Sequence, residues 1–201
     1  MLKKTEFTKL ETINMPTKYG NFLLTTYQTC LKNDKSMRYI FVVQTPNLPE
    51  VPIIRIHSAC LLSEIFNIEL CDCNDQMKKS LKLISKKKGI LFYLDQEGRG
   101  HGLFDKVREL KLQEKGYDHI EASIKLGLPV DSRKYYVVAK LLKAMKITKI
   151  RLITNNPRKI KDLEKDGIEI VERVIIKPYK NKHCYNYLLI KKEKQSHLID
   201  I

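Results

Sequence analysis

The stretch ILFYLDQEGRGHG, residues 90–102, decides the fold class. Its first five residues predict a buried strand over Ile90–Leu94, and the glycine-rich turn that follows leads into a predicted helix over Leu103–Lys115. A strand that passes through such a turn into a helix is typical of α/β sheets. The turn also offers backbone N–H groups and a helix N-terminus, which can receive an anion, and Arg99 could clamp a phosphate with two hydrogen bonds. The turn matches neither a P-loop nor a dinucleotide motif, so by itself it is only a weak indication of a phosphate-binding site.

Further strands and helices are predicted on both sides of this unit. The predicted strands cover residues 22–27, 39–43, 52–57, 149–153 and 169–175. The predicted helices cover residues 74–88, 133–145, 157–166 and 185–197. Because strands come first and β-α alternation follows, we expect a mixed α/β (α+β) fold, a single domain over residues 1–201 with a mixed sheet flanked by helices and an antiparallel part near the N-terminus. We expect the two ends, about 1–16 and 197–201, to be mobile.

The chain has 201 residues and a formal net charge of +15, with 30 lysines and eight arginines. No run of about 18 apolar residues is present, and the N-terminus lacks the apolar stretch of a secretory signal, so we expect a cytoplasmic protein with no membrane partner. A basic protein can bind nucleic acid, but base and phosphate recognition favours arginine. Because most of the positive charge is lysine and Trp is absent, we interpret the excess as surface lysine and do not expect a nucleic-acid partner.

Three of the five cysteines lie in the window HSACLLSEIFNIELCDCN, residues 57–74. Cys60, Cys71 and Cys73 have the spacing Cys-x10-Cys-x-Cys, and thiolates are ligands suited to zinc. Three protein ligands with one open position are typical of catalytic zinc sites, so the sequence predicts one Zn²⁺ per chain; three inert thiols are the alternative. His57 is a possible fourth ligand, or it faces substrate or core. The cysteines that fit no ligand spacing are expected to be core or surface thiols: Cys30 and Cys184.

Two further segments carry side chains suited to phosphate. In TNNPRK, residues 154–159, the amides of a helix start together with Thr154, Arg158 and Lys159 would suit phosphate; a plain capping turn is the alternative. Asp131 and Arg133 lie close together at the start of another predicted helix. Asp131 is either an ordinary helix N-cap or one half of a pair that orients a water or holds a leaving phosphate.

Taken together, these motifs resemble the GTP cyclohydrolase II family over nearly the whole chain, from about Met15 to Leu198. The matching positions in the first half are Pro16-Thr17, Gly20, Phe22, Arg55-Ile56-His57-Ser58, Cys60, Cys71-Asp72-Cys73, Gln76 and Gln96-Glu97-Gly98-Arg99-Gly100 with Gly102-Leu103. Those in the second half are Gln113, Gly116-Tyr117-Asp118, Glu121-Ala122, Leu126-Gly127, Asp131, Arg133, Thr154-Asn155-Asn156-Pro157, Lys159, Val171-Glu172-Arg173 and His197-Leu198. Their order and spacing make the match specific to that family.

The resemblance implies a function and a role for each motif. Cys60, Cys71 and Cys73 would hold a catalytic zinc ion, and water activated there would attack C8 of GTP, open the imidazole ring and release formate. Arg133 would attack the α-phosphate and release pyrophosphate, with Asp131 as its acid/base partner. The residues around the nucleotide would be Arg55, His57, Ser58, Gln76, Glu97, Gly98, Arg99, Thr154 and Lys159. Mg²⁺ would accompany the triphosphate, the product would be a diaminopyrimidine ribosylamino phosphate for riboflavin biosynthesis, and the protein would be a homodimer.

Four positions depart from the family pattern. Ala59 stands where the family has a glutamate beside the zinc, and Leu110 where it has a tyrosine near the metal. His119 replaces a threonine that contacts the nucleotide, and His101 stands where an aliphatic residue is usual. Both histidines would then supply proton transfer in an altered pocket, or they are neutral substitutions.

These departures keep other functions open. Because acid–base help is worth about 10²–10⁴-fold, loss of a tyrosine proton donor predicts a variant cyclohydrolase that stops at a formamidopyrimidine product. A variant that acts on another purine nucleotide in a specialised pathway is also consistent with the changed pocket. The alternative from a different class is a non-catalytic zinc protein that binds nucleotide or RNA.

Overall fold

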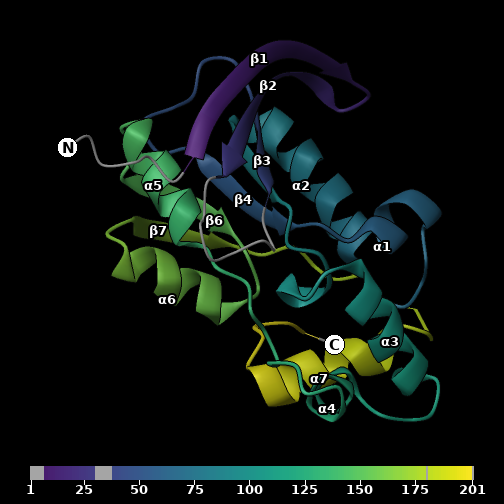
Figure 1. Ribbon diagram of the computed structural model, residues 1–201. Helices are drawn as coiled ribbons and strands as arrows, with labels where there is room; N and C mark the ends of the chain where they lie inside the picture. Colours follow the sequence, from purple (N-terminus) through teal and green to yellow (C-terminus); the bar gives the residue numbers. More distant parts are fainter. Residues whose placement is uncertain (1–6, 30–37, 180, 201) are drawn as a thin grey trace.

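The computed structural model describes residues 7–29, 38–179 and 181–200 (Figure 1). Within these ranges seven strands form one sheet in the order β1-β2-β3-β5-β4-β6-β7. The strands are β1 (Phe7–Thr17), β2 (Gly20–Thr29), β3 (Tyr39–Gln44), β4 (Ile53–Ser58), β5 (Gly89–Leu94), β6 (Lys149–Ile153) and β7 (Glu169–Val174). β1, β2, β3 and β5 pair antiparallel, whereas β5, β4, β6 and β7 pair parallel. The expected mixed α/β class is therefore confirmed, including its antiparallel part near the N-terminus.

The central strand β4 shows how the sequence forms both core and site. Five of its six residues are buried, as expected for a parallel strand that is covered on both faces. Ile54 and Ile56 belong to the core on one face of the sheet. Ile53 belongs to the core on the other face, and the period of two places Arg55 and His57 in the same row as Ile53. On this face, the row therefore changes from an apolar core residue to polar residues toward the carboxyl end of the strand.

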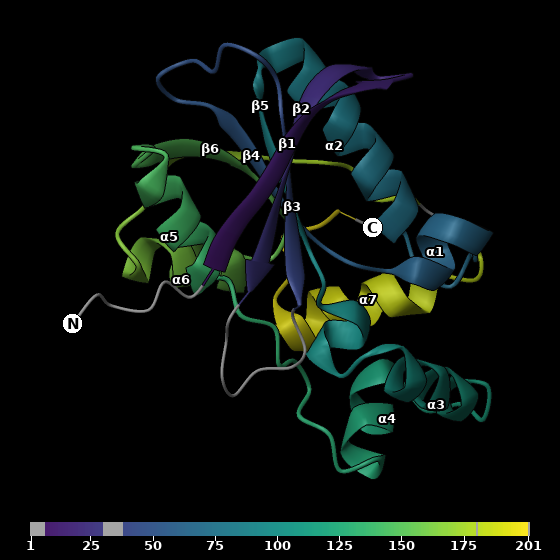
Figure 2. The ribbon, with the colours of Figure 1, turned by 45° about the horizontal axis from the view of Figure 1, so that its top comes forward.

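Helices cover the two faces of the sheet and one of its ends. They are α1 (Leu61–Phe66), α2 (Cys73–Lys87), the 3₁₀ turn η1 (Glu97–Gly100), α3 (Leu103–Gln113), α4 (His119–Lys125), α5 (Tyr136–Ala144), α6 (Pro157–Lys165) and α7 (Tyr185–Gln195). Leu141 of α5 and Leu163 of α6 join the core on one face, whereas Ile84 of α2 joins the core on the other. Figure 2 shows α3, α4 and α7 gathered beyond one end of the sheet. None of the helices in the described ranges is long and apolar enough to span a membrane.

Two helices and one helix boundary differ from the sequence-based expectations. The patterns above do not predict α1 or α4. α4 begins at a capping box, in which Asp118 accepts hydrogen bonds from the amides of Ile120 and Glu121 and donates its own amide hydrogen to the Glu121 carboxylate. This Asp-x-x-Glu spacing is the signal that could have identified the helix. The helix expected from residue 133 begins at Tyr136, so Asp131 is not its N-cap.

The mobility expected of the chain ends stays a prediction, but the described residues there belong to defined elements. Residues 7–16 belong to β1 and pair with β2. Near the other end, Ile199 packs in a small core with Leu188 and Cys184, which is a buried core thiol. The parts of these expectations that lie outside the described residues concern residues 1–6, residue 201 and Cys30.

The central position of β4 predicts a large cost for truncating its core side chains. Ile54→Ala should lower the free energy of unfolding by about 2–5 kcal/mol, because it leaves a cavity between the sheet and α5. Val171→Ala on β7, where the side chain is 49% exposed, is the matched control and should change it by about 0.5 kcal/mol or less. Urea unfolding followed by circular dichroism measures both values. Equal losses in the two variants would contradict the assigned core.

Candidate active site

The three cysteines of the sequence window lie together at the carboxyl end of β4. Cys60 precedes α1, Cys71 lies in the following loop, and Cys73 is the first residue of α2. The sulfur atoms of Cys60 and Cys71 are 3.7 Å apart, and all three sulfurs lie within 4.8 Å of one another. Zinc–sulfur bonds of about 2.3 Å in a tetrahedral site would place two sulfurs roughly 3.8 Å apart. The donor set and its spacing therefore fit a thiolate-bound metal ion such as zinc.

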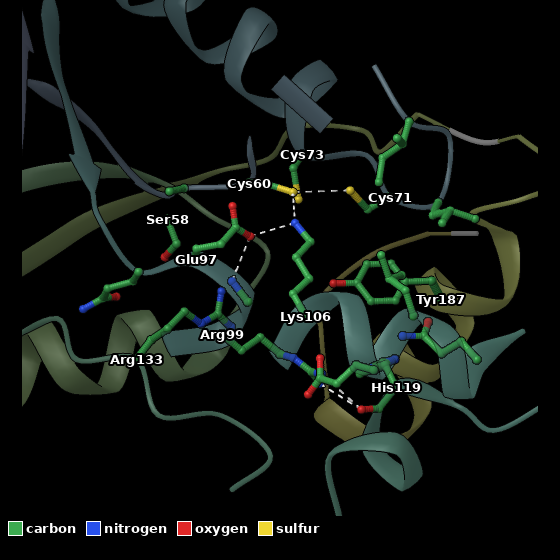
Figure 3. Close-up of a pocket in the computed structure, with 18 residues that line it drawn as sticks. Ser58, Cys60, Cys71, Cys73, Glu97, Arg99, Lys106, His119, Arg133 and Tyr187 are labelled. Carbon is green, nitrogen blue, oxygen red and sulfur yellow. Dashed lines mark hydrogen bonds and ion pairs between the residues drawn. The ribbon is translucent and has the colours of Figure 1, made fainter. Parts of the chain in front are cut away.

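A lysine that the sequence analysis missed stands beside this cluster. The ammonium group of Lys106 lies 3.0 Å from the Cys60 sulfur and 2.7 Å from Oε1 of Glu97 (Figure 3). Burial opposes the charge of Lys106, but the neighbouring Cys60 and Glu97 raise its pKa. Lys106 shares its face of α3 with Leu110 but also with Glu109 and Gln113, which line the same cavity, so the spacing of apolar residues gave no signal for it.

The glycine-rich turn after β5 is held by its own side chains. Gly98 and Arg99 both have left-handed backbone, with φ of 55° and 57°. Glu97 is buried and accepts hydrogen bonds from the amides of Leu61 (2.6 Å) and Gly98 (2.9 Å), which ties the turn to the start of α1. These contacts fix the turn at the edge of the cysteine cluster.

Arg99 is engaged by protein groups rather than free to clamp a phosphate. Its terminal nitrogens donate to the Glu109 carboxylate (2.5 Å), the Ser123 hydroxyl (3.0 Å) and the backbone oxygen of His119 (3.1 and 3.2 Å). The Glu109 side chain is buried and also accepts a hydrogen bond from Ser123. Arg99 therefore joins the turn to α3 and α4, and the two terminal nitrogens expected to hold a phosphate already have partners.

Two adjoining cavities open at this end of the sheet. The first, which we call the thiolate compartment, is lined by Cys60, Cys71, Cys73, Glu97, Lys106, Leu110, His119 and Tyr187, among others. The second, the cation compartment, is lined by Arg55, Gln76, Arg133, Thr154, Lys159, Lys191 and His197, among others. The residues that line both are Ser58, Cys73, Arg99, Arg133 and Tyr187. A ligand that spans this shared wall would meet the thiol cluster at one end and the cations at the other.

Two cations of the cation compartment, Arg55 and Lys159, are buried and are oriented by backbone oxygens. Arg55 donates to the oxygen of Ile153 (3.3 Å) and to Gln76 Oε1 (2.5 Å), and Lys159 donates to the oxygen of Ile56 (2.8 Å). Burial is the main cause that lowers the pKa of both Arg55 and Lys159. The charge of Arg133 also lowers the pKa of both, and the charge of Arg55 lowers that of Lys159. An anion in this compartment would relieve that repulsion.

Asp131 and Arg133 form a paired site in the segment before α5. Oδ1 of Asp131 accepts from the amide (3.0 Å) and Nε (2.9 Å) of Arg133, and Oδ2 accepts from Nη2 (2.6 Å). Arg158 adds a second contact to Asp131 at 3.4 Å. Burial would raise the pKa of Asp131, but the bonds from Arg133 outweigh it and lower the pKa to about 2. The carboxylate therefore stays charged and holds the guanidinium in one orientation.

His57 is held in one tautomer beside the shared wall. Its Nε2 lies 2.9 Å from Glu64 Oε1, and Glu64 also accepts hydrogen bonds from the Tyr93 hydroxyl (2.7 Å) and the Cys60 amide (3.0 Å). Burial lowers the pKa of His57, so the ring is neutral, donates from Nε2 and carries its lone pair on Nδ1. His57 thus faces the cation compartment as a hydrogen-bond acceptor.

Several buried polar atoms around the two compartments have no hydrogen-bond partner among the described residues. They include Arg55 Nε, His57 Nδ1, Ser58 Oγ, Asp72 Oδ1, Asn155 Oδ1 and His119 Nε2. Buried polar atoms are normally satisfied by protein or by ordered water. Their concentration around one pair of cavities favours a polar ligand that supplies both donors and acceptors.

The four positions that depart from the family pattern have different surroundings. Ala59, Leu110 and His119 line the thiolate compartment. Burial, together with the charge of Arg99, lowers the pKa of His119 to about 3, so its ring is neutral. His101 lines neither compartment and makes a 2.7 Å contact with the backbone oxygen of Pro129. The expectation of a pocket altered near the base therefore concerns three of the four residues.

The comparisons with known proteins agree with this arrangement. A family model described as GTP cyclohydrolase II matches residues 8–175. GTP cyclohydrolase-2 of Helicobacter hepaticus is 41% identical over 191 residues, which cover 94% of this chain and 97% of that protein. GTP cyclohydrolase-2 of Helicobacter pylori (strain J99) is 40% identical over 185 residues, covering 92% and 94%. The riboflavin biosynthesis protein RibBA of Staphylococcus epidermidis is 41% identical over 187 residues, which cover 93% of this chain and 47% of that protein.

The chain belongs to the GTP cyclohydrolase II family. It spans about half the length of the RibBA relatives that it matches and nearly the full length of the GTP cyclohydrolase-2 relatives. The matched region contains the cysteine cluster, the glycine-rich turn and the Asp131–Arg133 pair, and it ends before α7.

The pairing of Asp131 with Arg133 predicts a pH-dependent stability. The pKa of Asp131 falls from 3.8 to about 2 on folding. The contribution of this carboxylate to the free energy of unfolding is therefore present above pH 3.8 and is lost as the pH falls toward 2. Near neutral pH the free energy of unfolding of the wild type should exceed that of Asp131→Asn by about 2 kcal/mol. This difference should become smaller as the pH falls from 3.8 toward 2. Urea unfolding at several pH values measures it. Asp105→Asn, which removes a pair with the exposed Arg108, is the control and should change stability by about 0.5 kcal/mol or less throughout. A difference for Asp131→Asn that does not vary with pH would contradict the assigned pairing.

Proposed function

We propose that this protein hydrolyses GTP, opening the guanine imidazole ring at C8 and releasing formate and pyrophosphate to leave a diaminopyrimidine ribosylamino phosphate for riboflavin biosynthesis. The observation that carries the proposal is the wall shared by the thiolate and cation compartments. A nucleoside triphosphate has a reacting ring at one end and a polyanion at the other, and it matches a site with thiols at one end and buried cations at the other. Membership of the GTP cyclohydrolase II family supports the same reaction.

The cation compartment would bind the triphosphate. Arg55 and Lys159 are fixed by backbone oxygens, and Thr154 lies beside them at the start of the α6 turn. Gln76 accepts from Arg55 and donates to Asp72 Oδ2 at 2.6 Å, so it would position Arg55. Magnesium would enter with the triphosphate oxygens, as is usual for nucleotide sites.

Cys60, Cys71 and Cys73 would hold zinc, which when bound supplies a Lewis acid that lowers the pKa of water beside the guanine ring. The protein groups would orient the ring there. Nδ1 of His57 would accept a hydrogen bond from the nucleotide, and Ser58 Oγ would make a second contact. Glu97, Gly98 and Arg99 would shape the wall of the site through the turn that they hold.

The resemblance assigns to Arg133 the attack on the α-phosphate, with pyrophosphate as the leaving group. That role is supported by the position of Arg133, which lines both compartments. Asp131 Oδ2 is 2.6 Å from Nη2, within reach to take the proton that the attacking nitrogen loses. In the free protein the pair stays ionic, so this transfer would accompany the attack.

One observation favours a second candidate function, a cyclohydrolase that stops at a formamidopyrimidine. Leu110 lines the thiolate compartment and has no proton to donate to a leaving nitrogen. The neutral His119 on the same wall would be its substitute or would alter which purine nucleotide the site accepts. The products of the reaction separate these possibilities.

Incubation with GTP, zinc and magnesium should consume GTP and release one formate and one pyrophosphate per GTP. Mass spectrometry of the nucleotide product, with enzymatic assays for formate and pyrophosphate, checks this outcome. Pyrophosphate with a formylated pyrimidine and no formate would establish the stalled reaction instead. Nucleotide or RNA binding without turnover of any purine nucleoside triphosphate would contradict both cyclohydrolase functions.

The metal assignment has its own test. Cys71→Ser should reduce bound zinc well below one equivalent and abolish ring opening, because it removes one of three closely spaced thiol ligands. Cys184→Ser, which changes a buried thiol outside the cluster, is the matched control and should keep one equivalent. Inductively coupled plasma mass spectrometry measures the zinc. A full equivalent in Cys71→Ser would mean that the ligands are misassigned. The homodimer and the cytoplasmic location stay predictions.

A further inference from the structure

Helix α7 contributes a polar stripe to the site, although the family model ends at residue 175. Tyr187, Lys191 and Gln195 follow one another at intervals of four, which places them on one face of the helix. All three line the cation compartment. Tyr187 also lines the thiolate compartment, so α7 closes the wall that the two compartments share. The sequence alone predicted only a helix at this place.

This stripe is not the face by which α7 is anchored. Leu188 packs with Cys184 and Ile199 in a small core of their own. Lys194 forms an ion pair with Asp118 at the start of α4, and the chain just after the helix is tied to the turn after β6. Because other residues hold α7 in place, the polar stripe is left facing the cavities.

The phenol of Tyr187 is oriented by its neighbours. Its ring meets the His119 ring edge-on at a centroid distance of 4.8 Å, and the Lys191 ammonium lies 4.0 Å from the ring centre. Figure 3 shows the hydroxyl end of the ring turned into the thiolate compartment. None of the hydrogen bonds of the described residues involves the Tyr187 hydroxyl, and the half-buried ring is held on two sides.

Two other ionisable groups of the thiolate compartment have partners already, whereas the Ser58 hydroxyl and Nε2 of the neutral His119 ring have none among the described residues. Lys106 contacts Glu97 and the Cys60 sulfur. Glu109 is held by Arg99 and Ser123. Leu110 of α3 also lines this compartment and has no proton to donate. A substrate ring in this compartment would therefore find the Tyr187 hydroxyl as an oriented donor with no competing bond.

We propose that α7 is part of the active site and that Tyr187 is a catalytic residue, the proton donor to the nitrogen that leaves C8. The inference rests on the proposed function. In each hydrolysis the oxygen of water bonds to C8, the C8–N bond breaks, and its electron pair goes to nitrogen, which takes a proton. The Tyr187 hydroxyl gives that proton, and the proton lost by the water returns to the phenolate. The tyrosine is regenerated and no oxidant or reductant is needed.

Tyr187→Phe removes the hydroxyl and keeps the ring that packs on His119 and Lys191. Steady-state kinetics with GTP should show kcat reduced by about 10²-fold or more, with KM and bound zinc nearly unchanged. Tyr185→Phe is the matched control, because Tyr185 lies on the same helix and is 45% exposed, and it should keep wild-type kcat. A 3-fluorotyrosine at position 187 keeps a donor and should retain at least a tenth of the wild-type turnover.

The outcomes separate this inference from the function on which it rests. Wild-type kcat in Tyr187→Phe would overturn the role of Tyr187 while leaving the proposed function intact. Loss of zinc, or equal loss of turnover in the phenylalanine and fluorotyrosine variants, would assign Tyr187 a structural role and also overturn it. If wild type itself consumes no GTP, the proposed function fails and this inference fails with it.

Discussion

The parallel run of β5, β4 and β6 is the constraint on which the site depends. Parallel strands end at the same edge of a sheet, and ligands in such sheets bind beyond the carboxyl ends of the strands. Here β4 ends at Ser58 and is followed by Ala59-Cys60, β5 is followed by the glycine-rich turn, and β6 by Thr154 and the α6 turn. Segments nearly a hundred residues apart in the sequence therefore meet at one edge, and each brings a different group to it. The antiparallel strands β1–β3 extend the sheet on its other side and contribute core rather than chemistry.

The parts of the site that could be predicted from the sequence are those whose residues lie close together along the chain. The strand–turn–helix unit after residue 90 and the cysteine window each lie within a few residues of chain, so spacing and composition are sufficient to identify them. Lys106 could not be assigned in this way, because its role depends on how α3 packs over the cysteine cluster. The same holds for Glu109, whose carboxylate determines what Arg99 does. For Tyr187 the interval of four was visible, but which face of α7 meets the site depends on tertiary docking.

Arg99 shows how packing changes the meaning of a motif. A cation in a glycine-rich turn is a reasonable phosphate ligand on local grounds. The buried Glu109 and the Ser123 hydroxyl instead draw its guanidinium toward α3 and α4, and the left-handed backbone of the turn is stabilised by that attachment. The cations that are left to meet an anion lie on the other side of the shared wall. Few of the 38 basic residues take part, which agrees with an excess of surface lysine.

The backbone oxygens that hold Arg55 and Lys159 have a consequence for the energetics of binding. Both oxygens belong to residues of the parallel strands, Ile153 and Ile56, so the two cations are brought together when the sheet forms. The repulsion between the two cations therefore lowers the stability of the folded protein and does not have to be overcome again when a ligand binds. A bound anion meets donors that need no rearrangement, and side chains that are already ordered lose little entropy on contact. A bound anion relieves the repulsion between the two cations, so it should raise the free energy of unfolding of the whole sheet.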